Sequence, residues 1–243
     1  MADGVLPWFD LTLSSPAENL ALDEALLLTA EAGAAGPALR FWEWPGYAIV
    51  VGAGGSVAID VDAEACRADN VSIHRRASGG GTVVLGPGCL LYSLVLGYDT
   101  TRELADVTAS YRWILGRVRA ALGPVLGADL VGTSDLADRT MKFSGNAQQR
   151  KARYLLHHGT LLYHFDLPRV GRYLKSPERM PAYREGRDHA AFLRNLPADA
   201  VTLKRLLVAA FDARPGDPAP AALDRVPSLV AEKYGRDDWV RRR

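Results

Sequence analysis

Residues 75–84, RRASGGGTVV, combine two arginines, a small hydroxyl residue and three consecutive glycines in front of a β-branched run. Glycine loses more backbone freedom on folding than any other residue, so three in a row indicate positive φ angles or a ligand close to the backbone. An arginine guanidinium and the N–H groups of a glycine loop both bind phosphate or carboxylate. The segment therefore predicts an anion-binding loop, and a tight hairpin turn is the alternative. Its spacing matches neither the P-loop nor the dinucleotide fingerprint.

A second group of polar residues lies in residues 141–167, MKFSGNAQQRKARYLLHHGTLLYHFDL. Lys142 precedes Ser144 by two residues, so on a strand the two side chains are expected to share a face. An isolated lysine on a strand is more often a solvated edge residue. His157 and His158 are expected to point to opposite sides of their strand. They therefore cannot bind one metal ion together, and one of them is expected to be a core histidine.

Length and composition limit the classes of protein that the chain can represent. Its 243 residues fit one large domain, and 48% hydrophobic with 23% charged residues is ordinary for a globular protein. A net charge of +1 argues against a nucleic-acid partner. The absence of a long apolar run or a basic, then apolar, N-terminal leader predicts a cytoplasmic protein without a membrane partner. Cys66 and Cys89 have no spacing typical of a disulfide framework or a zinc site.

Strand-like and helix-like segments alternate along the chain and must position these residues. Ser15, Pro16 and Glu18 form a capping-box start for a helix over residues 19–30. Further helices are expected at residues 60–69, 104–122 and 203–211, and strands at 38–44, 47–52, 71–76, 81–85, 89–96, 141–150 and 154–165, the last two as a hairpin. Most connections are too short for parallel crossovers. The pattern predicts an α+β fold, a mixed and largely antiparallel sheet with packed helices.

Several motifs taken together resemble the lipoate-protein ligase A family of the biotin and lipoate ligase superfamily. They are RRASGGGTVV, MKFSGNAQ and HHGTLL, preceded by NLALDEALL and by LRFWEW with VVG, and they extend over residues 19–167. The resemblance implies a biotin/lipoate ligase-like catalytic domain that activates lipoate or octanoate with ATP and Mg²⁺ as an acyl-adenylate. The acyl group would then pass to a lysine on a lipoyl domain of a 2-oxoacid dehydrogenase or on glycine cleavage H protein.

The resemblance also implies roles for individual residues. Lys142 corresponds to the catalytic lysine, and Asp135, which matches the aspartate of an NDL element, would be a Mg²⁺ ligand or else a turn residue. A lysine and backbone N–H groups stabilise the negative charge that develops when a carboxylate attacks an α-phosphate. The residues expected to hold the acyl-adenylate are Arg76, Ser78, Gly79, Gly80, Gly81, Thr82, Val83, Gly145, Asn146, His158 and Gly159.

Two departures from the ligase pattern leave nucleotide use open. The family's His-Asp pair and Asn-containing turn after the glycine loop are replaced here by residues 85–89, LGPGC. The expected catalytic domain spans residues 1–196, and residues 197–243 are a short helical extension rather than a full accessory domain. Either a partner chain supplies the accessory domain, or the reaction is not adenylation.

Two alternatives follow from these departures. Related octanoyltransferases use no ATP and pass the acyl group from acyl carrier protein through a cysteine, and Tyr92-Ser93 is typical of that branch. In that branch the nucleophilic cysteine is expected shortly before Lys142 or after the HHG strand, but residues 131–141 and 160–174 contain no cysteine. Cys89 is expected to be structural. The other alternative is a non-catalytic subunit that binds lipoate or a lipoyl domain.

The polar residues 173–196 lack a clear period. They are either a solvated connection or a docking surface, in which Arg179, Arg184 and Arg187 would meet an acidic lipoyl domain.

Overall fold

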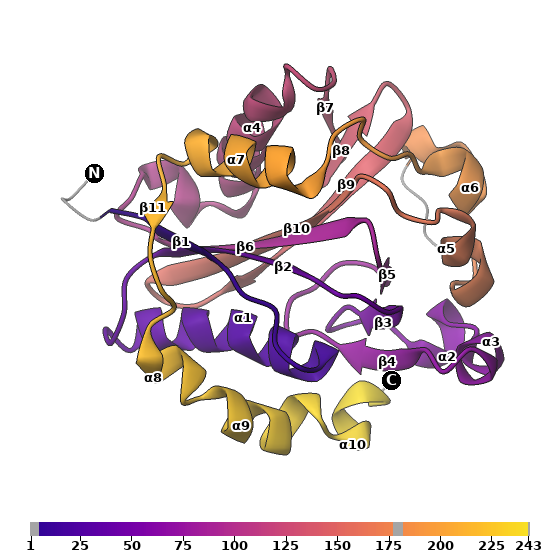
Figure 1. The fold of residues 1–243 in the computed structure, drawn as a ribbon, viewed down its shortest axis with the longest axis horizontal. Helices are drawn as coiled ribbons and strands as arrows, with labels where there is room; N and C mark the ends of the chain where they lie inside the picture. Colours follow the sequence, from indigo (N-terminus) through magenta and orange to yellow (C-terminus); the bar gives the residue numbers. More distant parts are fainter. Residues whose placement is uncertain (1–4, 177–181, 243) are drawn as a thin grey trace.

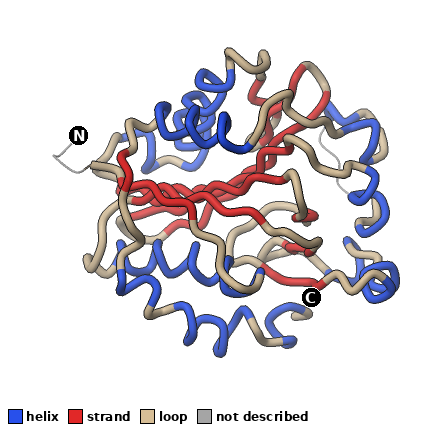
Figure 2. The backbone as a smooth tube through the Cα atoms, in the orientation of Figure 1, coloured by secondary structure: helices blue, strands red, loops and turns tan. Residues whose placement is uncertain are grey.

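A mixed sheet forms the centre of the computed structural model, which describes residues 5–176 and 182–242 (Figures 1 and 2). Within these residues the sheet has eight strands in the order β11-β1-β2-β6-β10-β9-β8-β7. The β11-β1-β2 pairs are parallel and all the other pairs are antiparallel, which confirms the predicted fold class. The strands are β1 (Pro7–Asp10), β2 (Ala38–Glu43), β6 (Cys89–Gly97), β7 (Asp129–Val131), β8 (Asp135–Asp138), β9 (Met141–Arg150), β10 (Tyr154–Leu162) and β11 (Arg214–Pro215).

Three short strands form a second sheet beside the first. The strands β3 (Ala48–Val51), β4 (Ser72–Arg75) and β5 (Val83–Leu85) lie in the order β4-β3-β5. The predicted strands at 38–44 and 47–52 therefore exist, but they belong to different sheets. The glycine loop connects β4 to β5, so both of its ends are anchored in the small sheet.

Helices cover both faces of the large sheet (Figure 1). On one face lie α4 (Val107–Leu122) and α7 (Ala200–Ala210), and on the other lies α1 (Pro16–Glu31). Ser15 caps α1 as predicted, because its Oγ accepts a hydrogen bond from the Glu18 N–H and donates one to the Glu18 carboxylate. Each face has its own hydrophobic core, one around α1 and the other around α4 and α7.

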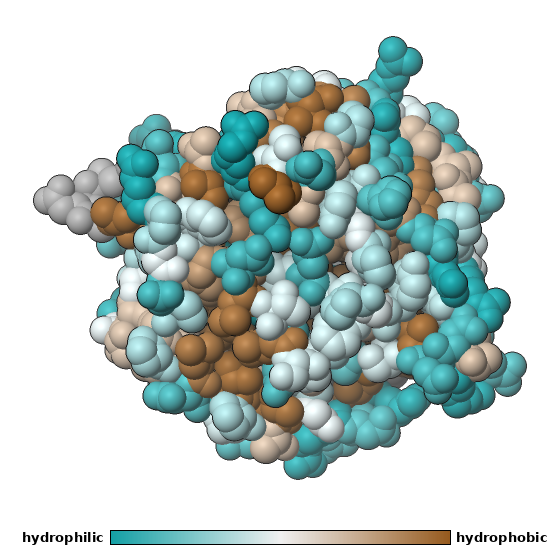
Figure 3. All heavy atoms as spheres, viewed as in Figure 1, coloured by the Kyte–Doolittle hydropathy of each residue, from teal (hydrophilic) through white to brown (hydrophobic). Residues whose placement is uncertain are grey.

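The segment beyond residue 196 packs on both faces of the sheet. Helix α7 covers α4, and β11 pairs with β1 at the sheet edge. The remaining helices, α8 (Pro220–Leu223), α9 (Val226–Leu229), the π-helical turn Val230–Tyr234 and α10 (Asp237–Val240), lie below α1, and α8, α9 and the turn contact it directly. Brown, hydrophobic atoms gather in this lower left region of an otherwise mainly polar face (Figure 3).

Helix α1 is enclosed by the sheet on one side and by these C-terminal helices on the other. Glu24 of α1 is only 4% exposed, and its carboxylate accepts hydrogen bonds from Lys233 Nζ (2.6 Å) and Tyr234 OH (2.8 Å). The lysine bond and the other hydrogen bonds outweigh the effect of burial, so the pKa of Glu24 is lowered. The buried charge of Glu24 in the middle of α1 is thus stabilised by partners more than 200 residues later in the chain.

The predicted helix over residues 60–69 is two short helices, α2 (Val57–Asp60) and α3 (Ala63–Ala68). The chain between them is extended at Val61, which pairs with Leu174, and Asp62 begins α3 by accepting from the Ala65 N–H (2.9 Å). The other short helices are α5 (Pro168–Tyr173) and α6 (His189–Phe192), with 3₁₀ turns at Arg102–Ala105 and Ala182–Arg184. No helix of the described chain is long and apolar enough to cross a membrane.

Candidate functional site

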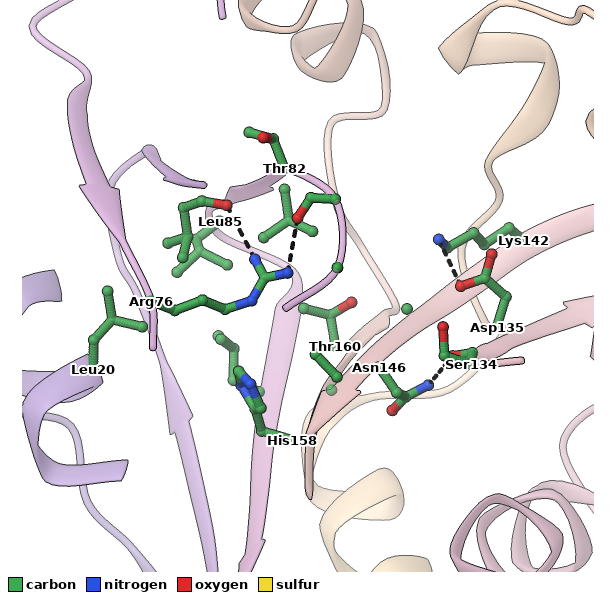
Figure 4. Close-up of a pocket in the computed structure, with 18 of the residues that line it drawn as sticks. Leu20, Arg76, Thr82, Leu85, Ser134, Asp135, Lys142, Asn146, His158 and Thr160 are labelled. Carbon is green, nitrogen blue, oxygen red and sulfur yellow. Dashed lines mark hydrogen bonds and ion pairs between the residues drawn. The ribbon is translucent and has the colours of Figure 1, made fainter. Parts of the chain in front are cut away.

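A cleft lies between the glycine loop and the hairpin of β9 and β10 (Figure 4). It consists of a smaller pocket of about 130 Å³ and a larger one of about 450 Å³. The smaller pocket has an apolar wall that includes Leu20, Trp42, Val50, Leu85 and Leu91. The residues shared by both pockets are Gly81, Thr82, Val83, Ser134, Asp135, Lys142, Gly145 and Thr160.

Arg76 shapes the glycine loop from inside. Its buried guanidinium donates hydrogen bonds to the carbonyl oxygens of Val50 (3.2 Å), Gly79 (2.6 Å) and Gly81 (2.8 Å), and to Ser78 Oγ (3.0 Å). Burial lowers the pKa of Arg76 to about 10, so the side chain stays charged at neutral pH. Arg76 lines the smaller pocket, but the loop itself occupies its donors. The hydrogen bonds of Arg76 therefore hold the loop in its conformation. They do not indicate direct contact between this guanidinium and a ligand anion.

The three glycines of the loop have different surroundings. Gly80 has φ +88°, and a Cβ there would lie 2.9 Å from Arg76 Nη2. Its carbonyl also passes so close to Gly52 that a Cβ on Gly52 would overlap it. Gly79 and Gly81 have no comparable contact, since no other atom of the described chain lies within 4 Å of the Cβ position. Gly81 lines both pockets, so its missing side chain leaves space in the cleft.

His157 and His158 point to opposite sides of β10, as predicted. His157 is fully buried beside Gln148 and Tyr92, which makes it the expected core histidine. His158 lines the smaller pocket, and its Nε2 lies 2.6 Å from Ser78 Oγ. Burial lowers the pKa of each histidine to about 3, with Arg76 contributing at His158, so both are neutral at pH 7.

Lys142 lies beside Gly145 rather than beside Ser144. The pairing of β9 with β8 shifts register at this point, so that Leu136 faces Ser144 while Ala137 faces Lys142. This β-bulge reverses the alternation of side chains. Lys142 Nζ lies 3.0 Å from where a Cβ of Gly145 would be. The prediction that Lys142 and Ser144 share a face was therefore wrong, because the sequence pattern does not reveal the bulge.

Asp135 and Tyr183 hold the Lys142 ammonium in the cleft. Asp135 Oδ1 lies 2.9 Å from Lys142 Nζ, and Asp135 Oδ2 accepts a hydrogen bond from Tyr183 OH (2.7 Å). Burial, followed by the Asp135 charge, raises the pKa of Tyr183, so its hydroxyl stays protonated as the donor. The chain that follows Tyr183 also contacts β9 through its backbone. The Arg194 N–H donates a hydrogen bond to the Lys142 carbonyl (2.9 Å).

The expected Mg²⁺ ligand, Asp135, has other partners in this structure. One carboxylate oxygen faces the Lys142 ammonium and the other accepts from Tyr183. In the described chain no three His, Cys, Asp or Glu residues are placed to hold a metal ion together. Asp135 is thus engaged by Lys142 and Tyr183, and its role as a Mg²⁺ ligand stays a prediction.

Asn146 and Gly159 join the strands of the cleft wall. The Asn146 side chain accepts from Tyr92 OH (2.5 Å) and donates to the Ser134 carbonyl (2.8 Å) and Ser144 Oγ (3.1 Å). A Cβ on Gly159 would overlap Asn146 Oδ1, so the glycine makes this arrangement possible. Both residues line the smaller pocket, but the Asn146 amide is fully used within the protein.

Thr82 and Val83 lie where the two pockets meet. Thr82 Oγ1 donates to Asp60 Oδ2 (2.7 Å), which ties the end of the glycine loop to α2.

Docking of a lipoyl domain by the arginine-rich segment stays a prediction, and the structure bears on two of its three arginines. Arg184 is only 4% exposed. Arg187 donates to the carbonyls of Thr140 (3.1 Å) and Tyr183 (2.7 Å), and Arg179 lies outside the described residues. Sequence reasoning missed that this segment lines the larger pocket, through Tyr183, Arg184, His189, Phe192 and Leu193, together with Lys175. The density of aromatic and basic residues without a helical period was the available signal.

The cleft therefore offers a smaller pocket with an apolar wall that continues into a larger pocket, which further charged residues line, with an ammonium group at the junction. A slender apolar molecule with a polar head would fit the smaller pocket with its head near Lys142. Preorganised donors at that point would stabilise negative charge that develops on the head group.

Comparisons with known proteins agree with this arrangement. The family model described as the lipoyl protein ligase A/B catalytic domain matches residues 15–210. Relatives named octanoyltransferase LipM include one from Clostridioides difficile, 27% identical over 66% of each chain. Another, from Symbiobacterium thermophilum, is 27% identical over 93% of this chain and 94% of its own.

Two solved structures share the fold over nearly the whole chain. A bi-partite lipoate protein ligase from Thermoplasma acidophilum is 21% identical, with a TM-score of 0.82 over 98% of this chain and 95% of that one. A lipoate-protein ligase A bound with ATP is 22% identical, with a TM-score of 0.82 over 97% of both chains. Because the family model covers most of the sequence, the chain belongs to the lipoyl protein ligase A/B catalytic domain family, as an enzyme of the lipoate ligase and octanoyltransferase group.

Proposed function

We propose that the enzyme activates lipoate or octanoate with ATP as an acyl-adenylate and transfers the acyl group to a lysine of a lipoyl domain. The observation that carries this proposal is that no thiol lines the cleft. Both cysteines of the chain are buried in the core around α1, and Cys89 is fully enclosed. Burial raises the pKa of Cys89 to about 12 and also raises that of Cys66. Neither cysteine is thus placed and ionised to carry an acyl group in the cleft at neutral pH. Transfer through an acyl-adenylate needs no cysteine.

The residues of the cleft have distinct parts in this proposal. The apolar pocket holds the acyl chain, and Gly81 leaves room for the head group at the junction. Lys142, oriented by Asp135, stabilises negative charge on the reacting carboxylate and phosphoryl oxygens. The carboxylate of the acyl substrate would attack the α-phosphorus of ATP, and pyrophosphate would leave. The lysine amine of the lipoyl domain would then attack the acyl carbonyl, and AMP would leave. The shared fold of the ligase bound with ATP supports this reading.

The acceptor and any accessory chain are part of the same proposal. We expect the acceptor to be a lipoyl domain of a 2-oxoacid dehydrogenase or the glycine cleavage H protein, in the cytoplasm. The fold neighbour from Thermoplasma acidophilum is described as bi-partite and has nearly the length of this chain. This supports a separate accessory-domain protein as a second partner.

Octanoyl transfer from acyl carrier protein is the second candidate, because curated relatives carry the name octanoyltransferase. Pyrophosphate exchange separates the two reactions. We expect labelled pyrophosphate to enter ATP only when lipoate or octanoate is present. A transferase would instead modify the lipoyl domain from octanoyl carrier protein without ATP, and a non-catalytic binding subunit would do neither.

An enzyme without cysteines separates the adenylation reaction from transfer through an acyl-cysteine. The double variant Cys66→Ala with Cys89→Ala should keep most of its exchange activity, because neither thiol reaches the cleft. Its melting temperature must be measured in parallel, since both side chains fill the core. ATP-independent transfer that disappears in a folded double variant, with an acyl-cysteine trapped in the parent enzyme, would refute the adenylation proposal.

A further inference from the structure

Arg75, the first arginine of RRASGGGTVV, joins the turn at residues 52–55 to helix α10. Its side chain is fully buried, and its Nη1 donates hydrogen bonds to the first and last carbonyls of this turn (2.9 and 2.7 Å). Its Nε donates to the carbonyls of Trp239 (3.1 Å) and Val240 (3.0 Å) in α10, which lies beside β4 in Figure 1. The Trp239 indole N–H donates to the Arg75 carbonyl (3.0 Å). The buried arginine therefore bonds the turn and α10 to each other.

The 52–55 turn lies directly against the glycine loop. The Ala53 N–H donates a hydrogen bond to the Ser78 carbonyl (2.8 Å). A Cβ on Gly52 would overlap the carbonyl oxygen of Gly80, so the two backbones are in van der Waals contact. Gly80 also lines the smaller pocket. A shift of the turn would therefore move the wall of the cleft.

Further contacts fix the C-terminal side of this arrangement. Arg242 donates a hydrogen bond to the Ala53 carbonyl (2.6 Å), inside the turn. Two cations lie over the Trp239 ring, Arg242 at 3.8 Å and Lys233 Nζ at 4.5 Å. Lys233 also pairs with the buried Glu24 of α1 (2.6 Å). Trp239 is therefore held against the rest of the protein by contacts that do not involve the glycine loop.

We propose that α10 positions the glycine loop for the acyl ligand, with Trp239 and Arg75 as the positioning residues. Three consecutive glycines allow a wide range of backbone conformations, so the loop depends on its neighbours for its shape. A loop that is already ordered binds its ligand without the entropic cost of ordering it. Helix α10 lies beyond residues 15–210, which the family model matches, so this role does not follow from the family assignment. The inference rests on the proposed function only in that the cleft binds an acyl chain, which both candidate reactions require.

Hydrogen exchange in the free enzyme tests the positioning directly. Trp239→Phe removes the indole N–H but keeps an aromatic ring in the same place. We expect the backbone amides of residues 52–55 and 77–82 to exchange about fivefold faster, which is the effect of losing one neutral hydrogen bond. Trp113→Phe, in α4 on the opposite face of the large sheet, should leave these amides unchanged. Faster exchange throughout the chain would show general destabilisation and overturn the proposal, as would parent-like exchange of the loop.

Calorimetric titration with lipoate tests the consequence for binding. Trp239→Phe should lose about fivefold in affinity and Arg242→Gln about threefold, since each removes one hydrogen bond behind the loop. Arg241→Gln, which removes the neighbouring charge from a residue bonded to Asp237, should bind like the parent. Because coupling between two sites is reciprocal, lipoate should also slow hydrogen exchange at residues 236–242 of the parent. A lower melting temperature with both of these readouts unchanged would assign α10 to folding alone and overturn the proposal.

The positioning and the proposed function can fail separately. A parent enzyme that binds neither lipoate nor octanoate would refute the proposed function, while hydrogen exchange in the free enzyme would still decide whether α10 positions the loop. Parent-like lipoate affinity of both Trp239→Phe and Arg242→Gln, with acyl transfer intact, would refute the positioning and leave the proposed function standing.

Discussion

Alanine substitutions in the glycine loop should separate its role in folding from its role in binding. Gly80 has φ +88°, and an alanine in the left-handed region costs about 1–2 kcal/mol. Its Cβ would lie 2.9 Å from Arg76 Nη2, which cannot move freely because it donates to the carbonyls of Gly79 and Gly81. We therefore expect Gly80→Ala to lose about 2–3 kcal/mol of unfolding free energy, which is roughly 4–12 °C in melting temperature for a chain of this size.

The two flanking glycines provide matched controls. Neither Gly79 nor Gly81 has a positive φ, and apart from their chain neighbours no atom of the described residues lies within 4 Å of either Cβ position. Each alanine variant should remain within about 0.5 kcal/mol of the parent in stability. Of these two glycines only Gly81 lines the cleft, so of these two variants only Gly81→Ala should lose affinity for a non-hydrolysable lipoyl-adenylate analogue, by at least about tenfold or 1.4 kcal/mol.

Urea denaturation and calorimetric titration of the three variants test this reasoning. Equal binding by Gly79→Ala and Gly81→Ala would show that the loop does not meet the ligand. A Gly80→Ala protein as stable as the parent would refute the argument from backbone conformation.

Three further predictions concern the neighbouring residues. Lys142→Ala should abolish acyl transfer, and its melting temperature must be measured in parallel because the change leaves Asp135, whose side chain is 17% exposed, without its ammonium partner. Lys142→Arg should also fail because the bulkier group does not fit over Gly145; near-normal activity of a folded Lys142→Ala protein would contradict its role. Tyr183→Phe removes the donor to Asp135, so kcat should fall about tenfold with little change in KM; a parent-like kcat would show that Tyr183 only packs. His157 and His158 have pKa values of about 3 in the fold, below the ordinary value near 6.5, so the unfolded chain binds more protons and the unfolding free energy should fall as pH decreases from 7 toward 4; equal urea midpoints at pH 7 and pH 5 would exclude this linkage.

Features specified by local sequence could be predicted. The start of α1 follows from the serine, proline and glutamate at its first turn, and the hairpin of β9 and β10 follows from two strand-like runs separated by a short charged interruption. The opposite orientation of His157 and His158 follows from the alternation of side chains along any strand. These features need no knowledge of which distant segments pack together.

Features that depend on distant partners could not be predicted. The face on which Lys142 lies is decided by a bulge in the pairing with β8. Arg76 turns inward, where it donates to the carbonyl of Val50 on another strand as well as to acceptors of its own loop. Arg184 is buried by packing that includes Phe192, although arginine is rarely buried in general. In each case a nonlocal contact overrides the usual preference of the residue type.

The enclosure of α1 has a consequence for how the protein is made. Every described residue of the cleft precedes residue 194, so the ribosome delivers the whole cleft before the helices that cover the outer face of α1. Until residues 220–234 emerge, the nascent chain exposes that apolar face, and Glu24 lacks Lys233 and Tyr234. Exposed apolar surface of this kind binds chaperones and promotes aggregation during synthesis. A polypeptide stalled before residue 220 would thus carry all the chemistry and yet be the species that quality control removes.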